Sequence, residues 1–130
     1  MNHTPVCYIV CALPQNHPFQ PESCDLVIAA DGGYAQMGGV RADLVVGDFD
    51  SLGYIPANEN VVRHPAEKDD TDTMLAARIG LSRGYRAFLL LGGVGGRLDH
   101  TLANIQTLAF LRENGARAAL LGEGETITFL

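Results

Sequence analysis

Residues 87–121 read AFLLLGGVGGRLDHTLANIQTLAFLRENGARAALL and contain an apolar run, a glycine-rich turn, a helical pattern and a second apolar run. This order predicts a strand over Ala87–Leu91, a helix over Asp99–Asn114 and a strand over Ala118–Leu121. Gly115 directly follows the expected helix, where a left-handed C-terminal cap favours glycine. A strand–helix–strand unit of this kind is typical of a parallel β-sheet.

The same alternation runs through the rest of the chain. A short helix is expected near Tyr34–Gly38 and a longer one over Thr71–Arg83, which Gly84 would end. We therefore predict an α/β fold with an open, mainly parallel sheet and flanking helices, in a Rossmann-like three-layer α/β/α arrangement. The other expected strands are Val6–Ala12, Asp25–Ala30, Asp43–Gly47 and Val61–His64.

Composition limits the classes of function. The 130 residues suit one compact domain, and 47% of them are hydrophobic. No apolar run approaches the roughly 20 residues of a membrane span, and the start of the chain lacks a cationic leader, so we expect a cytoplasmic protein with no membrane partner. The net charge of −6 argues against a nucleic-acid partner. Cys7, Cys11 and Cys24 form no Cys-x-x-Cys pair, and we expect buried thiols.

Charged or glycine-rich clusters follow the predicted strands. In open parallel sheets, ligands bind beyond the carboxyl ends of the strands. We therefore expect these segments to meet at one edge of the sheet. They are DGG at Asp31–Gly33, GDFDS at Gly47–Ser51, KDDTD at Lys68–Asp72 and GGVGGRLDH at Gly92–His100.

Two carboxylates, Asp48 and Asp50, stand one residue apart directly after a predicted buried strand. Magnesium would relieve their repulsion, because it is typically held by one or two carboxylates together with water and substrate phosphates. The alternative is structural: Asp48 would start a turn, and Asp50 with Ser51 would cap a neighbouring element.

The KDDTD segment adds a third acidic position. Thr71 suits the N-cap of the following helix, but Asp69, Asp70 and Asp72 together exceed what a cap requires. A carboxylate here would complete a magnesium site, while Lys68 and the helix N–H groups could meet phosphate oxygens. The pattern favours a role for these aspartates in ligand binding over helix capping alone.

The glycine-rich segment fits neither common nucleotide motif. Leu98 stands where G-x-G-x-x-G needs its third glycine, and the Walker A lysine is missing. Arg97 supplies a planar fork for phosphate, and Asp99 would cap the helix or orient Arg97. A tight turn alone explains two glycines better than four. The glycines that would let the backbone approach a ligand are Gly92, Gly93, Gly95 and Gly96.

Two signals are weaker. Asp31 with Gly32 is a common turn sequence after a strand. His100 and Asn104 lie one helical turn apart and share a face, where a structural role is expected for His100.

These motifs, in this order and at these separations, resemble the nucleotide-binding domain of the thiamine pyrophosphokinase family from about Val6 to Leu121. That family transfers the terminal pyrophosphate of ATP to the hydroxyethyl group of thiamine, releases AMP and uses Mg²⁺. The resemblance implies Asp48, Asp50 and Asp72 as metal ligands. It implies a catalytic set of Asp48, Asp50, Asp72, Arg97 and Asp99. The implied ATP-binding residues are Ser51, Lys68, Thr71, Gly93, Gly95, Gly96, Arg97 and Asn104, and the implied substrate residues are Asp31, Gly32 and Asp99.

Family members carry a second, all-β domain, and thiamine is held between subunits of a homodimer. Here GEGETITFL begins an alternating strand pattern, with Ile127 and Phe129 on one face. The resemblance thus implies an ATP- and magnesium-binding catalytic domain over 1–124, while 125–130 would start a β-domain absent from this sequence. We expect slow turnover by these residues alone.

In the implied reaction the alcohol attacks the β-phosphorus in line, and Arg97 stabilises charge on the phosphate oxygens. Asp99 or Asp72 could accept the proton of the attacking alcohol late in the transfer. Other functions stay open: a pyrophosphokinase for a pterin alcohol, a non-catalytic Mg-nucleotide-binding module, or a metal-dependent phosphoesterase.

Overall fold

A computed structural model describes residues 4–11, 20–30, 42–47, 61–63, 71–92, 98–122 and 126–128. Within these ranges, two helices accompany one seven-stranded sheet. The helices are α1 (Asp72–Ser82) and α2 (Leu98–Glu113). The strands are β1 (Cys7–Val10), β2 (Leu26–Ala30), β3 (Leu44–Gly47), β4 (Val61–Arg63), β5 (Ala87–Leu91), β6 (Arg117–Leu121) and β7 (Thr126–Thr128).

The sheet has the order β4-β3-β2-β1-β5-β6-β7, with every neighbouring pair parallel except β6 and β7. The predicted α/β class and mainly parallel sheet are confirmed. The expected strands lie within two residues of the observed ones at each end. The helix expected near Tyr34–Gly38 lies outside the described residues. None of the helices in the described ranges is long and apolar enough to cross a membrane.

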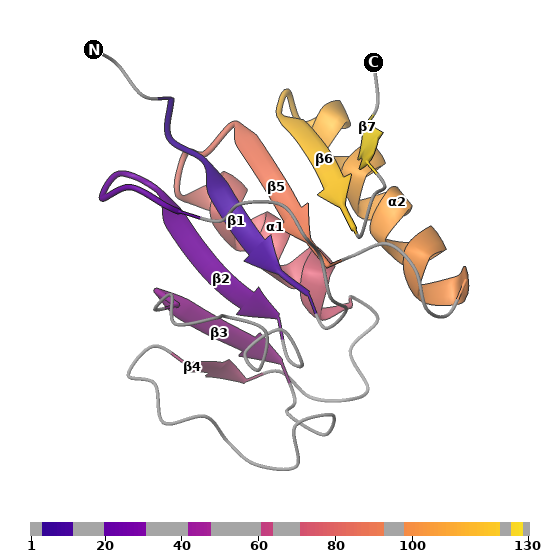
Figure 1. Cartoon of the computed structure of the whole chain (residues 1–130), viewed down its shortest axis with the longest axis horizontal. Coiled ribbons are helices and arrows are strands. Elements are labelled where there is room, and N and C mark those ends of the chain that lie inside the picture. Colours follow the sequence, from indigo (N-terminus) through magenta and orange to yellow (C-terminus); the bar gives the residue numbers. More distant parts are fainter. Residues whose placement is uncertain are drawn as a thin grey trace.

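Both helices lie on one face of the sheet (Figure 1). Strands β1 to β4 follow one another toward one edge, and α1 then brings the chain back past β3, β2 and β1 to β5. Helix α2 makes the shorter crossover to β6. The strand order therefore reverses between β1 and β5, the position at which open α/β sheets bind ligands.

Side chains from alternate strand positions form two apolar clusters. Cys7, Ile9 and Ile28 belong to the cluster that includes the helices, whereas Val10 and Val27 belong to the other. Because side chains alternate between the faces of a strand, the two clusters lie on opposite sides of the sheet. Burial on both faces explains why these strands read as continuous apolar runs in the sequence.

Helix α1 ends in a Schellman motif at the predicted glycine. Gly84 has a φ of 92° and donates its N–H to the Leu81 carbonyl at 3.0 Å. The Tyr85 N–H donates to the Gly80 carbonyl at 3.1 Å. These two bonds satisfy carbonyls that the helix end would leave unpaired.

The end of α2 repeats this arrangement. Gly115 has a φ of 80°, and its N–H reaches the Arg112 carbonyl at 3.0 Å. The Ala116 N–H reaches the Leu111 carbonyl at 2.9 Å, and both of these residues are buried. Each helix is thus stopped so that the next strand starts within a few residues.

Carboxylates organise the amino edge of the sheet, where the strands begin. Asp25 is 7% exposed and accepts the N–H groups of Val6 at 2.9 Å and Glu22 at 2.8 Å. Asp43 accepts the Val27 N–H at 2.8 Å. The sequence predicted that strands start at Asp25 and Asp43, but both residues precede the strands, because their side chains bind backbone groups there.

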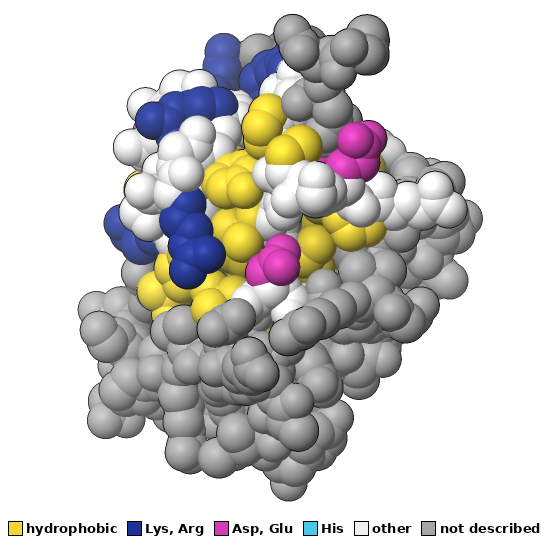
Figure 2. Space-filling view, turned by 90° about the vertical axis from the view of Figure 1, so that its left-hand side faces the viewer, with side chains coloured by type: hydrophobic (Ala, Val, Ile, Leu, Met, Phe, Trp, Pro, Cys, Tyr) yellow, Lys and Arg dark blue, Asp and Glu magenta, His cyan; other side chains and the backbone are white. Residues whose placement is uncertain are grey.

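All three cysteines are free, but only two match the expectation of buried thiols. Cys7 and Cys11 lie on β1 and just after it, facing the helices. Cys24 is exposed, because it lies in the polar turn before β2. Figure 2, seen from the side where the strands begin, shows hydrophobic side chains between a flank of arginines and separate acidic side chains.

Gly80→Ala should lower the free energy of unfolding despite the better helix propensity of alanine. An added Cβ would lie 2.6 Å from Phe88 Cε2 and 2.9 Å from Cys7 Sγ. Overpacking costs about 1–3 kcal/mol, against a propensity gain of about 1 kcal/mol. Urea denaturation measures the loss. The cost should shrink in a Phe88→Leu background, and a Gly80→Ala protein as stable as wild type would contradict the packing described.

Asp25→Ala should destabilise the fold by about 2 kcal/mol or more, because two backbone N–H groups lose their acceptor. Asp25→Asn keeps one oxygen and should lose less. Glu113→Ala, at an exposed position near the end of α2, serves as the control and should change stability by less than about 0.5 kcal/mol. Equal thermal stability of Asp25→Ala and wild type would refute this structural role.

Candidate functional site at the carboxyl edge of the sheet

The strands that precede three of the predicted motifs, β2, β3 and β5, end close to one another at one edge of the sheet. Val10 of β1 pairs with Ala29 of β2 and with Leu91 of β5, and Ala30 pairs with Val46 of β3. Beyond these strand ends, the chain continues into the DGG, GDFDS and GGVGG segments. Three motifs therefore leave the sheet from adjacent strands of its carboxyl edge or from strands separated only by β1.

Many predicted site residues lie outside the described part of the chain. They are Asp31, Gly32, Asp48, Asp50, Ser51, Lys68, Gly93, Gly95, Gly96 and Arg97. For the motifs that contain these residues, the structure shows that the preceding strands β2, β3 and β5 end at Ala30, Gly47 and Leu91.

The start of α1 is described in full. Thr71 is the N-cap, with φ −71° and ψ 164°, and its Oγ1 accepts the Met74 N–H at 3.1 Å. Its carbonyl accepts the Leu75 N–H at 3.0 Å. The predicted capping role of Thr71 is therefore confirmed, while its hydroxyl hydrogen is not used by this bond.

Asp72 is half-buried in the first turn of α1. A carboxylate there interacts favourably with the positive end of the helix dipole. Its oxygen atoms also have the donor chemistry that Mg²⁺ prefers. Within the described ranges, however, no three His, Cys, Asp or Glu residues form a group that could hold a metal. A magnesium site containing Asp72 would need carboxylates from outside these ranges.

Gly92 directly follows β5 and has a φ of 77°, and its N–H donates to the Leu121 carbonyl at 2.8 Å. This left-handed conformation gives a structural reason for glycine at the first position of the glycine-rich segment. The backbone conformation therefore accounts for Gly92 without the close approach to a ligand that the sequence analysis expected.

Helix α2 begins at Leu98, so Asp99 lies inside the first turn rather than at a cap position before it. Asn104 is 8% exposed and shares the buried stripe of α2 with Thr107, Leu108 and Leu111. The Thr107 hydroxyl donates to the Ala103 carbonyl at 3.3 Å. Asn104 is thus a polar side chain on the packed face of the helix.

Sequence reasoning missed a polar pair beside the start of α1. Cys11 Sγ and Thr73 Oγ1 lie 3.8 Å apart, and both residues are buried. Burial raises the pKa of the Cys11 thiol to about 11, and the hydrogen bond with Thr73 partly opposes this rise. The thiol is therefore neutral at physiological pH. The sequence signal that could have found it is the alternation of side chains between the two faces of β1, which places Cys7, Ile9 and Cys11 on the same face.

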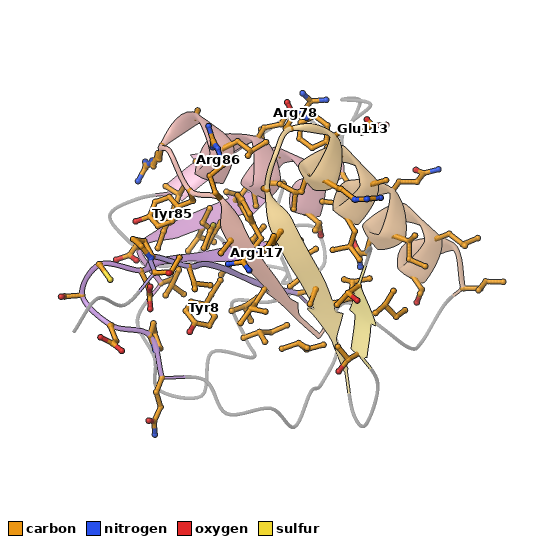
Figure 3. All side chains as sticks on the ribbon, turned by 90° about the horizontal axis from the view of Figure 1, so that it is seen from above. Tyr8, Arg78, Tyr85, Arg86, Glu113 and Arg117 are labelled. Carbon is orange, nitrogen blue, oxygen red and sulfur yellow. The ribbon has the colours of Figure 1, made fainter. Side chains whose placement is uncertain are left out.

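Five described arginines are exposed, and four of them lie toward the end of the molecule opposite the start of α1. Arg83 caps the C-terminus of α1, and Arg112 is in the last turn of α2. Arg86 and Arg117 stand at the beginnings of β5 and β6 and are labelled in Figure 3. Arg78 projects from α1 and lies over the Phe110 ring at 4.6 Å. Four of the six arginines in the described ranges thus lie away from the carboxyl edge, and Arg63, at the end of β4, lies at it.

Comparisons with known proteins agree on one family. A family model described as thiamin pyrophosphokinase, catalytic domain, matches residues 20–120. No curated protein sequence gives a significant match.

Solved structures of the same kind are similar in fold. A thiamine pyrophosphokinase from Bacillus subtilis is 26% identical with a TM-score of 0.74, over 89% of this chain and 60% of that protein. One from Geobacillus thermodenitrificans is 27% identical with a TM-score of 0.69, over 87% and 58%. A thiamin pyrophosphokinase family protein from Enterococcus faecalis is 29% identical with a TM-score of 0.68, over 91% and 61%.

The chain spans about 60% of the length of the Bacillus protein. The family model nevertheless covers more than three quarters of the chain, including β2 to β5, both helices and most of β6. By this match, the chain belongs to the thiamin pyrophosphokinase catalytic domain family.

Proposed function

We propose that the chain is the ATP- and magnesium-binding part of a thiamine pyrophosphokinase, which transfers pyrophosphate from ATP to thiamine and forms thiamine pyrophosphate and AMP. The family match over residues 20–120 carries this proposal. The fold supports it, because the strand order reverses between β1 and β5 and α1 begins at the same edge.

Charge distribution supports a role for a divalent cation. The chain has a net charge of −6, and four of the six described arginines lie toward the other end of the sheet, whereas Arg63 ends β4 at the carboxyl edge. Carboxylates at the carboxyl edge would repel a free triphosphate. Asp72, together with Asp48 and Asp50, would hold Mg²⁺, which would supply positive charge between these carboxylates and the phosphate oxygens.

The other residues of the proposed site would bind the phosphates of ATP and orient the reacting groups. The first turn of α1, capped by Thr71, presents backbone N–H groups and a positive dipole end to phosphate. Arg97 would hold phosphate oxygens as charge develops on them. Asp99 or Asp72 would accept the proton of the attacking alcohol late in the transfer, since a loose transition state requires little early deprotonation.

We extend the proposal to the nucleotide and substrate residues expected from the sequence. Ser51, Lys68 and Asn104 would contact ATP together with the glycine-rich segment. Asp31 and Gly32 would lie near the acceptor. Asn104 is the described member of this group, and it lies in the second turn of α2, in the N-terminal half of the helix.

The wider organisation is proposed on the same basis. A three-layer Rossmann-like arrangement is supported by the buried apolar cluster on the face opposite the helices. Residues 1–124 would form the catalytic domain, and 125–130 would begin a second domain, as the longer relatives suggest. The assembled enzyme would be a cytoplasmic homodimer that acts on ATP and thiamine and has no nucleic-acid partner.

Magnesium should be required for tight ATP binding, and Asp72→Asn should weaken Mg-ATP binding by about tenfold or more. The amide keeps the size of the side chain but loses its charge, so the free energy of unfolding should change by no more than about 1 kcal/mol. Calorimetry with ATP, with and without Mg²⁺, measures the magnesium requirement in wild type and the loss of Mg-ATP affinity in Asp72→Asn.

Glu113→Gln is the matched control, because it removes the same charge from an exposed position near the other end of the molecule. Equal ATP affinity in excess chelator would rule out the metal site. A large loss of apo stability in Asp72→Asn, with unchanged Mg-ATP affinity, would assign Asp72 to the fold alone.

AMP and thiamine pyrophosphate should form together when the protein is incubated with Mg-ATP and thiamine. Chromatography of the products measures both. We expect slow turnover, because placement of the alcohol contributes about 7–11 kcal/mol to such reactions and relatives contain further chain.

The assay also separates the competing functions. AMP formed with a pterin alcohol but not with thiamine would indicate a different acceptor. Mg-ATP binding without AMP release, even at high protein concentration, would indicate a binding module. Inorganic phosphate released from simple esters would indicate a phosphoesterase.

A further inference from the structure

Two buried thiols on one face of β1 contact opposite ends of α1. Cys7 Sγ lies close to Gly80, since an added Cβ there would be 2.9 Å away. Cys11 Sγ lies 3.8 Å from Thr73 Oγ1. Helix α1 therefore runs antiparallel to β1, and Cys11 marks the end at which the helix starts.

The surroundings of the two thiols differ. Cys7 packs against Phe88 and Gly80, which have no polar side-chain atoms. Cys11 Sγ has polar neighbours, the Thr73 hydroxyl at 3.8 Å and the Ile9 carbonyl, which accepts from the thiol at 3.9 Å. The backbone N–H of Cys11 donates to the Leu91 carbonyl at 2.7 Å. Cys11 is thereby fixed to β5 at the point where the strand order reverses.

Thr73 is the second residue of α1 and is 8% exposed. Within a helix, a threonine hydroxyl commonly bonds the carbonyl three or four residues earlier. For Thr73 those carbonyls belong to Asp70 and Asp69, which lie outside the described residues, and the contact described for its Oγ1 is the one with Cys11. Thr73 Oγ1 lies 3.8 Å from Cys11 Sγ, so the side chain is directed toward the end of β1.

We propose that the Cys11–Thr73 pair is a positioning device that fixes the first turn of α1 against the end of β1 and thereby places Asp72 and the helix N-terminus toward the ligand. The identity of that ligand rests on the proposed function. The anchoring of the turn does not, because it follows from the contact itself.

This role differs from simple core packing in a measurable way. A buried hydroxyl–thiol contact contributes little net stability, since an apolar isostere avoids the cost of burying polar groups. Thr73→Val should therefore leave the melting temperature of the apo protein unchanged or slightly higher. It should also free the first turn, because the directional contact is lost.

The test combines amide hydrogen exchange with calorimetry. In Thr73→Val, exchange of the Leu75 and Ala76 amides should be about threefold to tenfold faster than in wild type, while amides of β1 and β5 keep their rates. Mg-ATP binding should weaken by at least about threefold. Thr73→Ser retains the hydroxyl and should restore both properties.

Cys11→Ala should reproduce the effects of Thr73→Val on exchange and binding, and the double variant should add little to either single change. Cys7→Ala is the matched control, since it removes the other helix-facing thiol of β1. It should lower stability but leave exchange of the first turn and Mg-ATP affinity unchanged.

Unchanged exchange at Leu75 and Ala76 in both Thr73→Val and Cys11→Ala would overturn the proposal. Faster exchange with unchanged Mg-ATP affinity would overturn its link to the ligand. If wild type binds no Mg-ATP, the proposed function fails, and the exchange rates with the Thr73→Ser rescue still decide whether the pair anchors the turn.

Discussion

Strand β1 lies at the centre of the sheet, and the rest of the structure depends on its pairing. It pairs in parallel with β2 on one side and β5 on the other, and its side chains are buried or half-buried on both faces. A strand enclosed in this way has no access to water for its backbone groups, so both neighbours must supply hydrogen bonds. The pairing of β1 with β5 joins segments about 80 residues apart in the chain. It thereby brings the motifs that follow β2 and β3 close to the glycine-rich segment that follows β5.

The two edges of the sheet use acidic residues differently. At the amino edge, Asp25 and Asp43 accept backbone N–H groups and hold the entry into β1 and β2. At the carboxyl edge, Asp72 occupies a helix start whose capping bond is already made by Thr71.

Much of the fold could be predicted from the sequence because it depends on local signals. Gly84 and Gly115 identified the helix ends, and the apolar run over Ala87–Leu91 matched β5 residue for residue. The strand starts at Asp25 and Asp43 were predicted one residue early, since hydrophobic patterns do not reveal that a side chain binds the backbone. The order of the strands was not predicted, because pairing between distant segments leaves no local pattern.

The candidate site was less accessible to sequence reasoning. The capping role of Thr71 was recognisable from its place before a helical pattern, and its Oγ1 indeed accepts the Met74 N–H. The pairing of Cys11 with Thr73 could not be foreseen, because it joins residues 62 positions apart through a packing contact. The roles expected for Asp48, Asp50 and Arg97 stay predictions.

The strand order also has a consequence for how the chain folds. Residues paired between β5 and β6 are 30 positions apart, as for Ala87 and Arg117, whereas Cys7 and Phe88 of the β1–β5 pair are 81 apart. Each doubling of a closed loop costs about 0.6 kcal/mol more in chain entropy, and such distant contacts slow folding. We therefore expect the halves β1–β4 and β5–β7 to gain structure separately, and their joining along β1 and β5 to be the late, rate-limiting event.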